Sequence, residues 1–357
     1  MAKHMFAGAS SPIGFIDFFE HIMPLEKAKE RYFLKGSSGS GKSTFIKKIA
    51  ASFESKGGII EKFHCANDTD SLDAISVNNL GLCIIDATAP HSHDPEIPVA
   101  VDKIIDFACF LDEKKIAVHA DEIKSLILTK KKLAKKAQAY FGALGNVYLA
   151  EKSANEAALK MDCLVEIVQK YLEIFDFNGL QNRCGDDRKL FLSAVTPDGF
   201  VSFAENFFNG CKVYGICSCE RIGADIFLSN LKDGFNLQGI NTESFHCPFA
   251  PERLEYLYLP ESKAAFAIIG GKFGYAGRVC EKIDISSCID NQMLSYIKLN
   301  IEQNNELFDK VLSATVDSMK KSRDMHIRLE EIYAGAMDFG AVDEMTGRMI
   351  WKICYRE

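Results

Sequence analysis

Long hydrophobic runs are missing from this sequence. No stretch of apolar residues approaches the roughly 20 that a helix needs to cross a bilayer. The N-terminus also lacks a basic segment followed by an apolar one, which is the pattern of a signal peptide. We therefore expect a cytoplasmic protein with no membrane partner.

Paired cysteines and a surplus of basic residues are missing as well. The 12 cysteines are scattered without a C-x-x-C pair, and Cys83 and Cys109 fall within apolar runs, so we expect buried reduced thiols in place of a disulfide framework. The formal net charge is −7, whereas proteins that bind a nucleic-acid backbone usually carry a basic footprint. Nucleic acid is therefore not expected as the main partner.

What the sequence does contain is a stretch that fits the phosphate-binding pattern G-x-x-x-x-G-K-[ST] at every position. The apolar run 32–34 before it suits a buried strand, and residues 45–50 after it open with helical spacing. The motif therefore lies between a strand and a helix, as its mechanism requires. Its residues are Gly36, Ser37, Ser38, Gly39, Ser40, Gly41, Lys42, Ser43 and Thr44.

Each residue type in this motif has a role in holding a triphosphate. The glycines permit backbone conformations that aim successive N–H groups at phosphate oxygens, and the following helix adds its positive N-terminal end. Lys42 is predicted to reach the β- and γ-phosphates, Ser43 to bind Mg²⁺ and Thr44 to support the α-phosphate. The motif thus predicts a site for ATP and Mg²⁺, with GTP as an alternative nucleotide.

A second short run supplies a carboxylate for the metal. Residues 82–85 are apolar and are followed by Asp86. This pattern resembles the Walker B strand, whose aspartate holds Mg²⁺ in P-loop NTPases. We predict that Ser43 and Asp86 bind the ion together, and that Lys42 and Asp86 are catalytic.

The sequence also repeats itself. Phe63-His64-Cys65 recurs as Phe245-His246-Cys247, a shift of 182 residues (63 to 245), and the same shift pairs Gly41 with Gly223 without a gap. Repeats of this length indicate two copies of one fold. In the second copy, Ala224 and Asp225 stand at the positions of Lys42 and Ser43, and the strand matching 82–86 ends in glycine. We therefore predict a single nucleotide site, in the first half.

Strands alternating with helices predict an α/β fold, with a parallel sheet flanked by helices in each copy. Each copy ends in a long helical region, 114–175 and 293–355, where apolar residues recur at i, i+3 and i+4 without proline. Residues 178–187 form the candidate linker. We predict two domains: 1–180, a P-loop domain with both motifs and a helical tail, and 186–357, a degenerate P-loop-like domain with its own tail.

On these features the chain resembles an uncharacterised bacterial family of tandem P-loop proteins, usually labelled ATPases or nucleotide-kinase-like. The resemblance covers most of the length and implies a tandem P-loop fold and ATP binding, but no substrate. In such proteins both halves often keep a phosphate loop, which the second copy here has lost. The stretches that carry the resemblance are 32–36 leading into 41–44, 63–65 with 70–73, 86–91, and Ala336-Met337-Asp338-Phe339.

The first hypothesis for the chemistry is Mg-dependent ATP hydrolysis, gated or completed by the second half. No acidic residue follows Asp86 directly, so another side chain would have to orient the water. The candidates are Thr88, His91, His93 and Asp94. An arginine from the second half, Arg221 or Arg278, would then neutralise charge as a finger.

Two alternatives stay open. One is a small-molecule or nucleotide kinase, in which Asp68, Asp70 or Asp73, in an acidic loop expected after the strand at 59–65, accepts a hydroxyl proton. Otherwise these acids would cap a following helix. The other alternative is a nucleotide-gated scaffold with little turnover. Besides the nucleotide, the partner is an unidentified small molecule or protein, and a homo-oligomer is left open.

Overall fold

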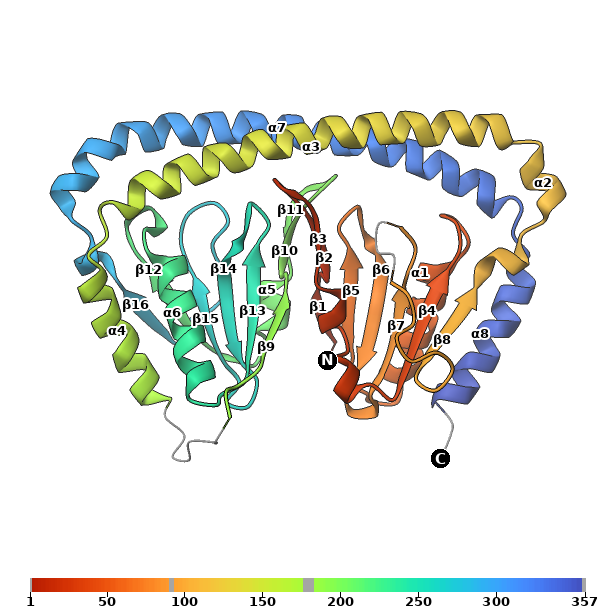
Figure 1. Ribbon diagram of the computed structural model, residues 1–357, viewed down its shortest axis with the longest axis horizontal. Coiled ribbons are helices and arrows are strands. Elements are labelled where there is room, and N and C mark those ends of the chain that lie inside the picture. Colours follow the sequence, from red (N-terminus) through yellow and green to blue (C-terminus); the bar gives the residue numbers. More distant parts are fainter. Residues whose placement is uncertain (1, 90–92, 176–182, 355–357) are drawn as a thin grey trace.

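Two six-stranded sheets lie side by side, and two long antiparallel helices bridge them (Figure 1). The computed structural model describes residues 2–89, 93–175 and 183–354. The first sheet has the strand order β1-β5-β6-β7-β4-β8, and the second has the corresponding order β9-β13-β14-β15-β12-β16. Corresponding strands therefore occupy the same places, which confirms the predicted repeat and the α/β class.

The strands of the two sheets correspond one to one. The first sheet contains β1 (Lys3–Met5), β4 (Glu30–Lys35), β5 (Glu61–Cys65), β6 (Asp68–Val77), β7 (Leu82–Asp86) and β8 (Asp102–Asp106). The second contains β9 (Asp187–Leu190), β12 (Lys212–Cys217), β13 (Thr242–Cys247), β14 (Ala250–Leu259), β15 (Ala264–Ile268) and β16 (Glu281–Asp284). Two hairpins complete the strands: β2 (Gly8–Ser11) with β3 (Gly14–Asp17), and β10 (Ser193–Thr196) with β11 (Gly199–Ser202).

The helices flank and bridge these sheets. They are α1 (Lys42–Glu54), α2 (Glu113–Ala117), α3 (Ala120–Glu156), α4 (Met161–Ile174), α5 (Ala204–Phe207), α6 (Ala224–Leu237), α7 (Asn291–Ala334) and α8 (Phe339–Cys354). They include the two predicted helical regions. Within the described ranges, none of them is both long and apolar enough to cross a membrane.

Each sheet is mixed, so the prediction of parallel sheets is wrong in one respect. β6 runs antiparallel to β5 and β7, and β14 does the same in the second copy. The acidic loop and helix cap expected at 68–73 are also wrong, because these residues begin β6. Only Ala66 and Asn67 separate β5 from β6, and so short a connection can join antiparallel strands but not parallel ones.

Apolar spacing fixes the position of α1 against the first sheet. Phe45, Ile49 and Phe53 recur every four residues and are buried on one face of the helix. They pack in one cluster with Leu34, which lies next to the last residue of β4. Burying each such side chain stabilises the fold by roughly 1.5–3 kcal/mol, which holds the start of α1 next to the end of β4.

The helical tails cross between the two copies. α4, from the first half of the sequence, packs on α6, and α8, at the end of the chain, packs on α1 (Figure 1). Two isolated bridges show that the exchange is reciprocal: Leu111 pairs with Met337 and Leu159 pairs with Ile289, so both partners shift by 178 residues (111 to 289, 159 to 337). Each packed unit therefore combines segments from both halves of the sequence.

One disulfide corrects the expectation that all the thiols are reduced. Cys163 in α4 is bonded to Cys288, and the other ten cysteines are free. The two residues are 125 positions apart in the sequence. They meet because α4 packs against the second copy, a contact for which the sequence holds no local signal.

The repeated Phe-His-Cys stretch has a structural role. Nδ1 of His64 donates a hydrogen bond to the carbonyl oxygen of Thr69 (2.7 Å), and Nδ1 of His246 donates to that of Pro251, at the equivalent position of the second copy. Each histidine thus fixes the irregular start of a hairpin, where the register of the strand pair shifts. Burial lowers the pKa of both imidazoles to about 4.

These lowered values predict a loss of stability on mild acidification. Between about pH 6.5 and pH 4 the unfolded chain binds protons that the folded histidines do not, so the free energy of unfolding should fall by roughly 1–3 kcal/mol for each buried histidine as the pH drops through this window. Urea unfolding of wild type and His246→Gln at several pH values checks this, since the variant should show a shallower slope. His119→Gln, which makes the same substitution at an exposed histidine, is the matched control.

Candidate functional site

The loop of residues 36–41 connects the carboxyl end of β4 to α1, as the motif predicts. Gly36, Gly39 and Gly41 have φ angles of 151°, 73° and 90°, which residues with a Cβ rarely adopt. α1 begins at Lys42. The positive end of the helix therefore faces the loop, an arrangement that favours anions.

The side chain of Lys42 lies inside the loop. Its ammonium donates hydrogen bonds to the carbonyl oxygens of Gly36 (2.9 Å) and Ser37 (2.7 Å), and lies 3.7 Å from Oδ2 of Asp86. Burial lowers the pKa of Lys42, while the charge of Asp86 opposes this effect. The structure thus brings together Lys42 and Asp86, which are 44 positions apart in the sequence.

The other predicted residues surround this pair. Oγ of Ser43 accepts a hydrogen bond from the backbone N–H of Leu72 (3.0 Å), and Oδ1 of Asp86 accepts one from the N–H of Thr88 (3.0 Å). The hydroxyl of Thr88 donates to the carbonyl oxygen of Gly36 (3.2 Å), which ties the end of β7 to the loop.

The serines of the loop differ in their partners. Oγ of Ser40 donates to the carbonyl oxygen of Ser37 (2.8 Å). Oγ of Ser37 is buried, and within the described part of the chain it has no hydrogen-bond partner. A buried hydroxyl of this kind fits a site that receives a polar ligand.

Asp73 on β6 is a third ionisable group at this site. Burial and the nearby charge of Asp86 raise its pKa to about 7, and Lys42 opposes the shift. The sequence interpretation placed Asp73 in a loop and gave it no preference over its acidic neighbours. The sequence of the second copy does indicate a strand at this position, because the equivalent stretch, 254–259, is an almost unbroken apolar run typical of a buried strand.

Helix α7 closes over the loop from the second half of the sequence. A Cβ built on Gly39 would lie 2.3 Å from the carbonyl oxygen of Glu330, so only glycine permits this approach. Oγ of Ser38 lies 3.3 Å from Nδ1 of His326, and that nitrogen accepts a hydrogen bond from Lys130 of α3 (2.6 Å). Both long helices therefore contribute side chains to the first loop.

The groups on these helices have shifted pKa values. Burial, together with the charges of Lys130 and Lys42, lowers the pKa of His326 to about 4, which leaves the imidazole neutral. Burial also lowers the pKa of Lys130 and raises that of Glu330. A cation and a carboxyl group with weakened hydration thus lie next to the loop.

The equivalent site of the second copy is filled by ion pairs. Asp225, at the position of Ser43, pairs with Lys152 of α3 (3.0 Å) and with Arg253 of β14, and Arg253 also pairs with Glu156 (2.6 Å). Burial alone would raise the pKa of Asp225, but these two cations lower it. The protein's own carboxylate therefore lies where the first copy has a hydroxyl.

The predicted arginine finger is wrong. Arg221 belongs to the loop of the second copy, where it keeps a left-handed conformation (φ 58°) and is partly buried near Tyr148 and Glu255. Arg278 is exposed in the connection between β15 and β16. The two loops lie on opposite sides of the molecule (Figure 1), so neither arginine reaches Lys42. Lys130 of α3 is a basic side chain that does approach the first loop, through its contact with His326.

The candidates for orienting water are only partly assembled. His91 lies outside the described residues. The ring of His93 stacks on Phe19 (5.2 Å between centroids), and Asp94 is almost fully exposed, 3.5 Å from Lys35. Of the three candidates within the described residues, Thr88 is the one with a hydrogen bond to the loop.

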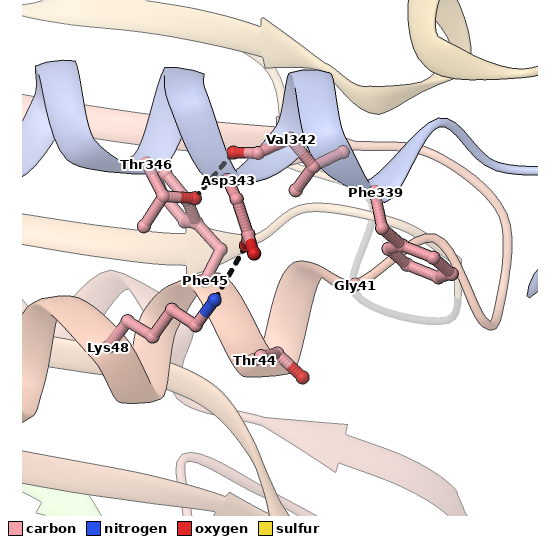
Figure 2. A pocket seen from close by; sticks show the side chains of 8 residues that line it. All are labelled: Gly41, Thr44, Phe45, Lys48, Phe339, Val342, Asp343 and Thr346. Atoms are coloured by element: carbon pink, nitrogen blue, oxygen red, sulfur yellow. Dashed lines mark hydrogen bonds and ion pairs between the residues drawn. The ribbon is translucent and has the colours of Figure 1, made fainter.

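A cavity of about 230 Å³ adjoins the loop between α1 and α8 (Figure 2). Thr44, the last residue of the motif, borders it, whereas Lys42 does not. Phe339 and Val342 of α8 form its apolar wall, and Lys48 and Asp343 form an ion pair across it (2.6 Å). The loop thus has two sides: one with Lys42 and Asp86, and one with Thr44 and the cavity.

The oxygen atoms present fit a magnesium ion. Mg²⁺ prefers hard oxygen ligands, and it is commonly held by one or two carboxylates together with phosphate oxygens. Ser43 and Asp86 are a hydroxyl and a carboxylate on adjacent elements at the loop. Across the described ranges, no group of three or more His, Cys, Asp or Glu side chains is arranged to hold a metal ion.

Comparison with known proteins adds no family to this description. A scan against protein-family models finds no match, and searches of the curated proteins and of the solved structures find none either. The resemblance to tandem P-loop proteins stays a prediction, and the chemistry has to be inferred from the residues and their geometry.

Proposed function

We propose that the protein is a P-loop NTPase that binds ATP with Mg²⁺ at a single site in its first half and hydrolyses it there, with GTP as the alternative substrate. One observation carries the proposal: a loop of left-handed glycines, the ammonium of Lys42 within it and the carboxylate of Asp86 3.7 Å from that ammonium meet where β4 and β7 end. Binding of a metal-bound triphosphate requires these groups together.

Each side chain has a separate role in the proposed complex with the nucleotide. Lys42 neutralises charge on the β- and γ-phosphates, and Thr44 supports the α-phosphate. Ser43 and Asp86 hold Mg²⁺, which, when bound, neutralises charge on the phosphate oxygens. Lys130 is the cation best placed to act beside the loop, because its ammonium already contacts His326 there. The second copy contributes no nucleotide site, since ion pairs fill the equivalent position.

Asp73 is the best candidate to accept a proton from the attacking group. Its carboxyl group is buried on β6 beside Asp86 and Lys42, and burial raises its pKa above the usual value of an aspartate, which favours proton uptake. The attacking group is water in hydrolysis and a hydroxyl in phosphoryl transfer. This buried carboxyl group is the observation that also keeps a small-molecule or nucleotide kinase as a second candidate function.

Phosphate release from Mg-ATP, with and without pooled nucleosides and sugars, separates the two reactions. Hydrolysis predicts free phosphate without an acceptor, and transfer predicts a labelled product only when an acceptor is present. Asp73→Asn should lower either rate by about 100- to 10,000-fold without a matching loss of ATP affinity. Asp70→Asn, which removes an exposed carboxylate on the same strand, should leave the rate unchanged. Full activity of Asp73→Asn would exclude Asp73 as the base.

The contact of α7 with the loop supports a coupling between nucleotide and helices. The backbone at Glu330 touches Gly39, so a triphosphate that changes the conformation of the loop must also shift α7, and the position of α7 in turn limits the conformation of the loop. A nucleotide-gated scaffold would use the same contact with little turnover. Binding of ATP without release of phosphate or formation of product would favour that alternative.

A further inference from the structure

The cavity between α1 and α8 has the features of a site for a nucleotide base. Gly41 and Thr44, on the side of the loop assigned to the α-phosphate, line it together with Lys48 farther along α1, whereas Lys42 does not. A nucleotide whose γ-phosphate lies at Lys42 would therefore direct its base toward this cavity. The position of the cavity follows from the motif, but its second wall is supplied by α8, from the far end of the chain (Figure 2).

The size of the cavity suits part of a nucleotide. Pockets that hold whole drug-sized ligands have volumes of about 300–1,000 Å³, and this cavity, at about 230 Å³, is smaller. It therefore takes a single ring system, while the phosphates lie outside it in the loop.

The wall residues match the two surfaces of a purine. The ring of Phe339 is partly exposed, and a Cβ built on Gly41 would lie 3.3 Å from it, so an aromatic ring stands beside the loop. Aromatic side chains stack on bases. At the edge, the carboxylate of Asp343 is an acceptor, and the hydroxyl of Thr346 keeps acceptor capacity after donating to the carbonyl oxygen of Val342 (2.7 Å). Acceptors are what the amino group of a base requires.

The ion pair at the mouth of the cavity does not block this use. The side chains of Lys48 and Asp343 are 45% and 62% exposed, and exposed pairs of this kind are weak. Asp343 is therefore free to exchange Lys48 for a hydrogen-bond donor on a ligand.

Resting on the proposed function, we propose that α8 forms the base-binding wall of the nucleotide site, with Phe339 stacking on a purine and Asp343 accepting a hydrogen bond from its amino-bearing edge. The two halves of the sequence then build one site: the first supplies the phosphate loop and the second supplies the base pocket. Adenine and guanine share this chemistry, so the test includes both nucleotides.

Calorimetric affinities for Mg-ATP, Mg-GTP and Mg-tripolyphosphate, which has no base, test the pocket. Phe339→Ala should weaken binding of the preferred nucleotide by about 5- to 100-fold, and Asp343→Asn by about 5-fold or more, while both keep the wild-type affinity for tripolyphosphate. Matched controls lie on the same helix: Trp351→Ala removes another exposed aromatic ring, and Glu344→Gln another exposed carboxylate. Neither control should change any of the affinities.

The outcomes separate the pocket from the site on which it depends. Nucleotide binding that is unchanged in both Phe339→Ala and Asp343→Asn, or that is no tighter than tripolyphosphate binding in the wild type, would overturn the base pocket and leave the phosphate site standing. Absence of wild-type binding to all three ligands would overturn both. Thermal melts show whether Phe339→Ala remains folded. Asp343→Asn changes an exposed side chain, so this variant tests the proposal even if Phe339→Ala does not fold.

Discussion

Lys42→Ala is expected to weaken binding of Mg-ATP by about 10- to 100-fold or more. In the proposed complex the ammonium exchanges the carbonyl oxygens of Gly36 and Ser37 for phosphate oxygens, and a hydrogen bond between charged groups contributes roughly 1.5–3 kcal/mol. The measurement is isothermal calorimetry with Mg-ATP, alongside circular dichroism to show that the variant is folded. Tripolyphosphate affinity should fall in parallel, because the lost contact is to phosphate.

A neighbouring lysine provides the control for this variant. Lys47 follows in the same helix and is exposed, so Lys47→Ala removes the same charge from α1 without touching the loop. Equal losses in the two variants would mean that the net charge of the helix, and not the position of Lys42, governs binding. An unchanged affinity in Lys42→Ala would remove the basis of the proposed function.

Local patterns predicted the parts of this site that lie within one strand, loop or helix. The spacing from Gly36 to Thr44 indicated a turn from strand to helix, and the run ending at Asp86 indicated a strand, and both lie where expected. These patterns can be recognised from the local sequence alone, because a glycine with positive φ or an apolar alternation needs no distant partner.

The contributions from other parts of the chain could not be predicted in this way. His326 and Glu330 reach the loop because α7 spans both copies, and Phe339 reaches it because α8 packs on the copy to which it does not belong in sequence. A helix needs the same apolar spacing whether it packs on its own copy or on the other one, because the two copies offer similar surfaces. The repeat itself was visible in the sequence, but which copy a tail covers was not.

The pseudo-two-fold axis of this exchange passes close to a buried charge cluster. Phe6 and Phe191, equivalent in the repeat, exchange backbone hydrogen bonds across the axis (2.9 and 3.0 Å). Beside them, Arg188 of β9 forms a two-pronged pair with Glu61 (2.7 and 2.9 Å) and a longer contact with Glu243 (3.2 Å). The two glutamates are themselves equivalent, so the axis brings together like charges that a single arginine has to compensate.

The two carboxyl groups respond differently to this shared arginine. Burial would raise the pKa of Glu61, but the charge and hydrogen bonds of Arg188 hold it at about 2, so Glu61 is ionised. Burial raises the pKa of Glu243, whose second oxygen has no hydrogen-bond partner among the described residues. Lys3, at the position of Arg188 in the first copy, lies over the rings of Phe207 and Tyr258 (4.2 and 4.6 Å) and has no such pair with any residue that the structure describes. The cluster is therefore asymmetric, and Glu61 depends on Arg188.

Arg188→Met is accordingly expected to lower the free energy of unfolding by about 3–5 kcal/mol, because it leaves the ionised Glu61 buried without its partner. Urea unfolding at neutral pH measures the loss. The double variant Arg188→Met/Glu61→Gln should recover most of it, since the stranded charge is then removed together with its partner. Glu243→Gln should cost far less than Glu61→Gln, because Arg188 keeps its two-pronged pair. Similar losses in these two single variants would show that both glutamates share the arginine equally, and a loss below about 1 kcal/mol in Arg188→Met would show that water already reaches the cluster.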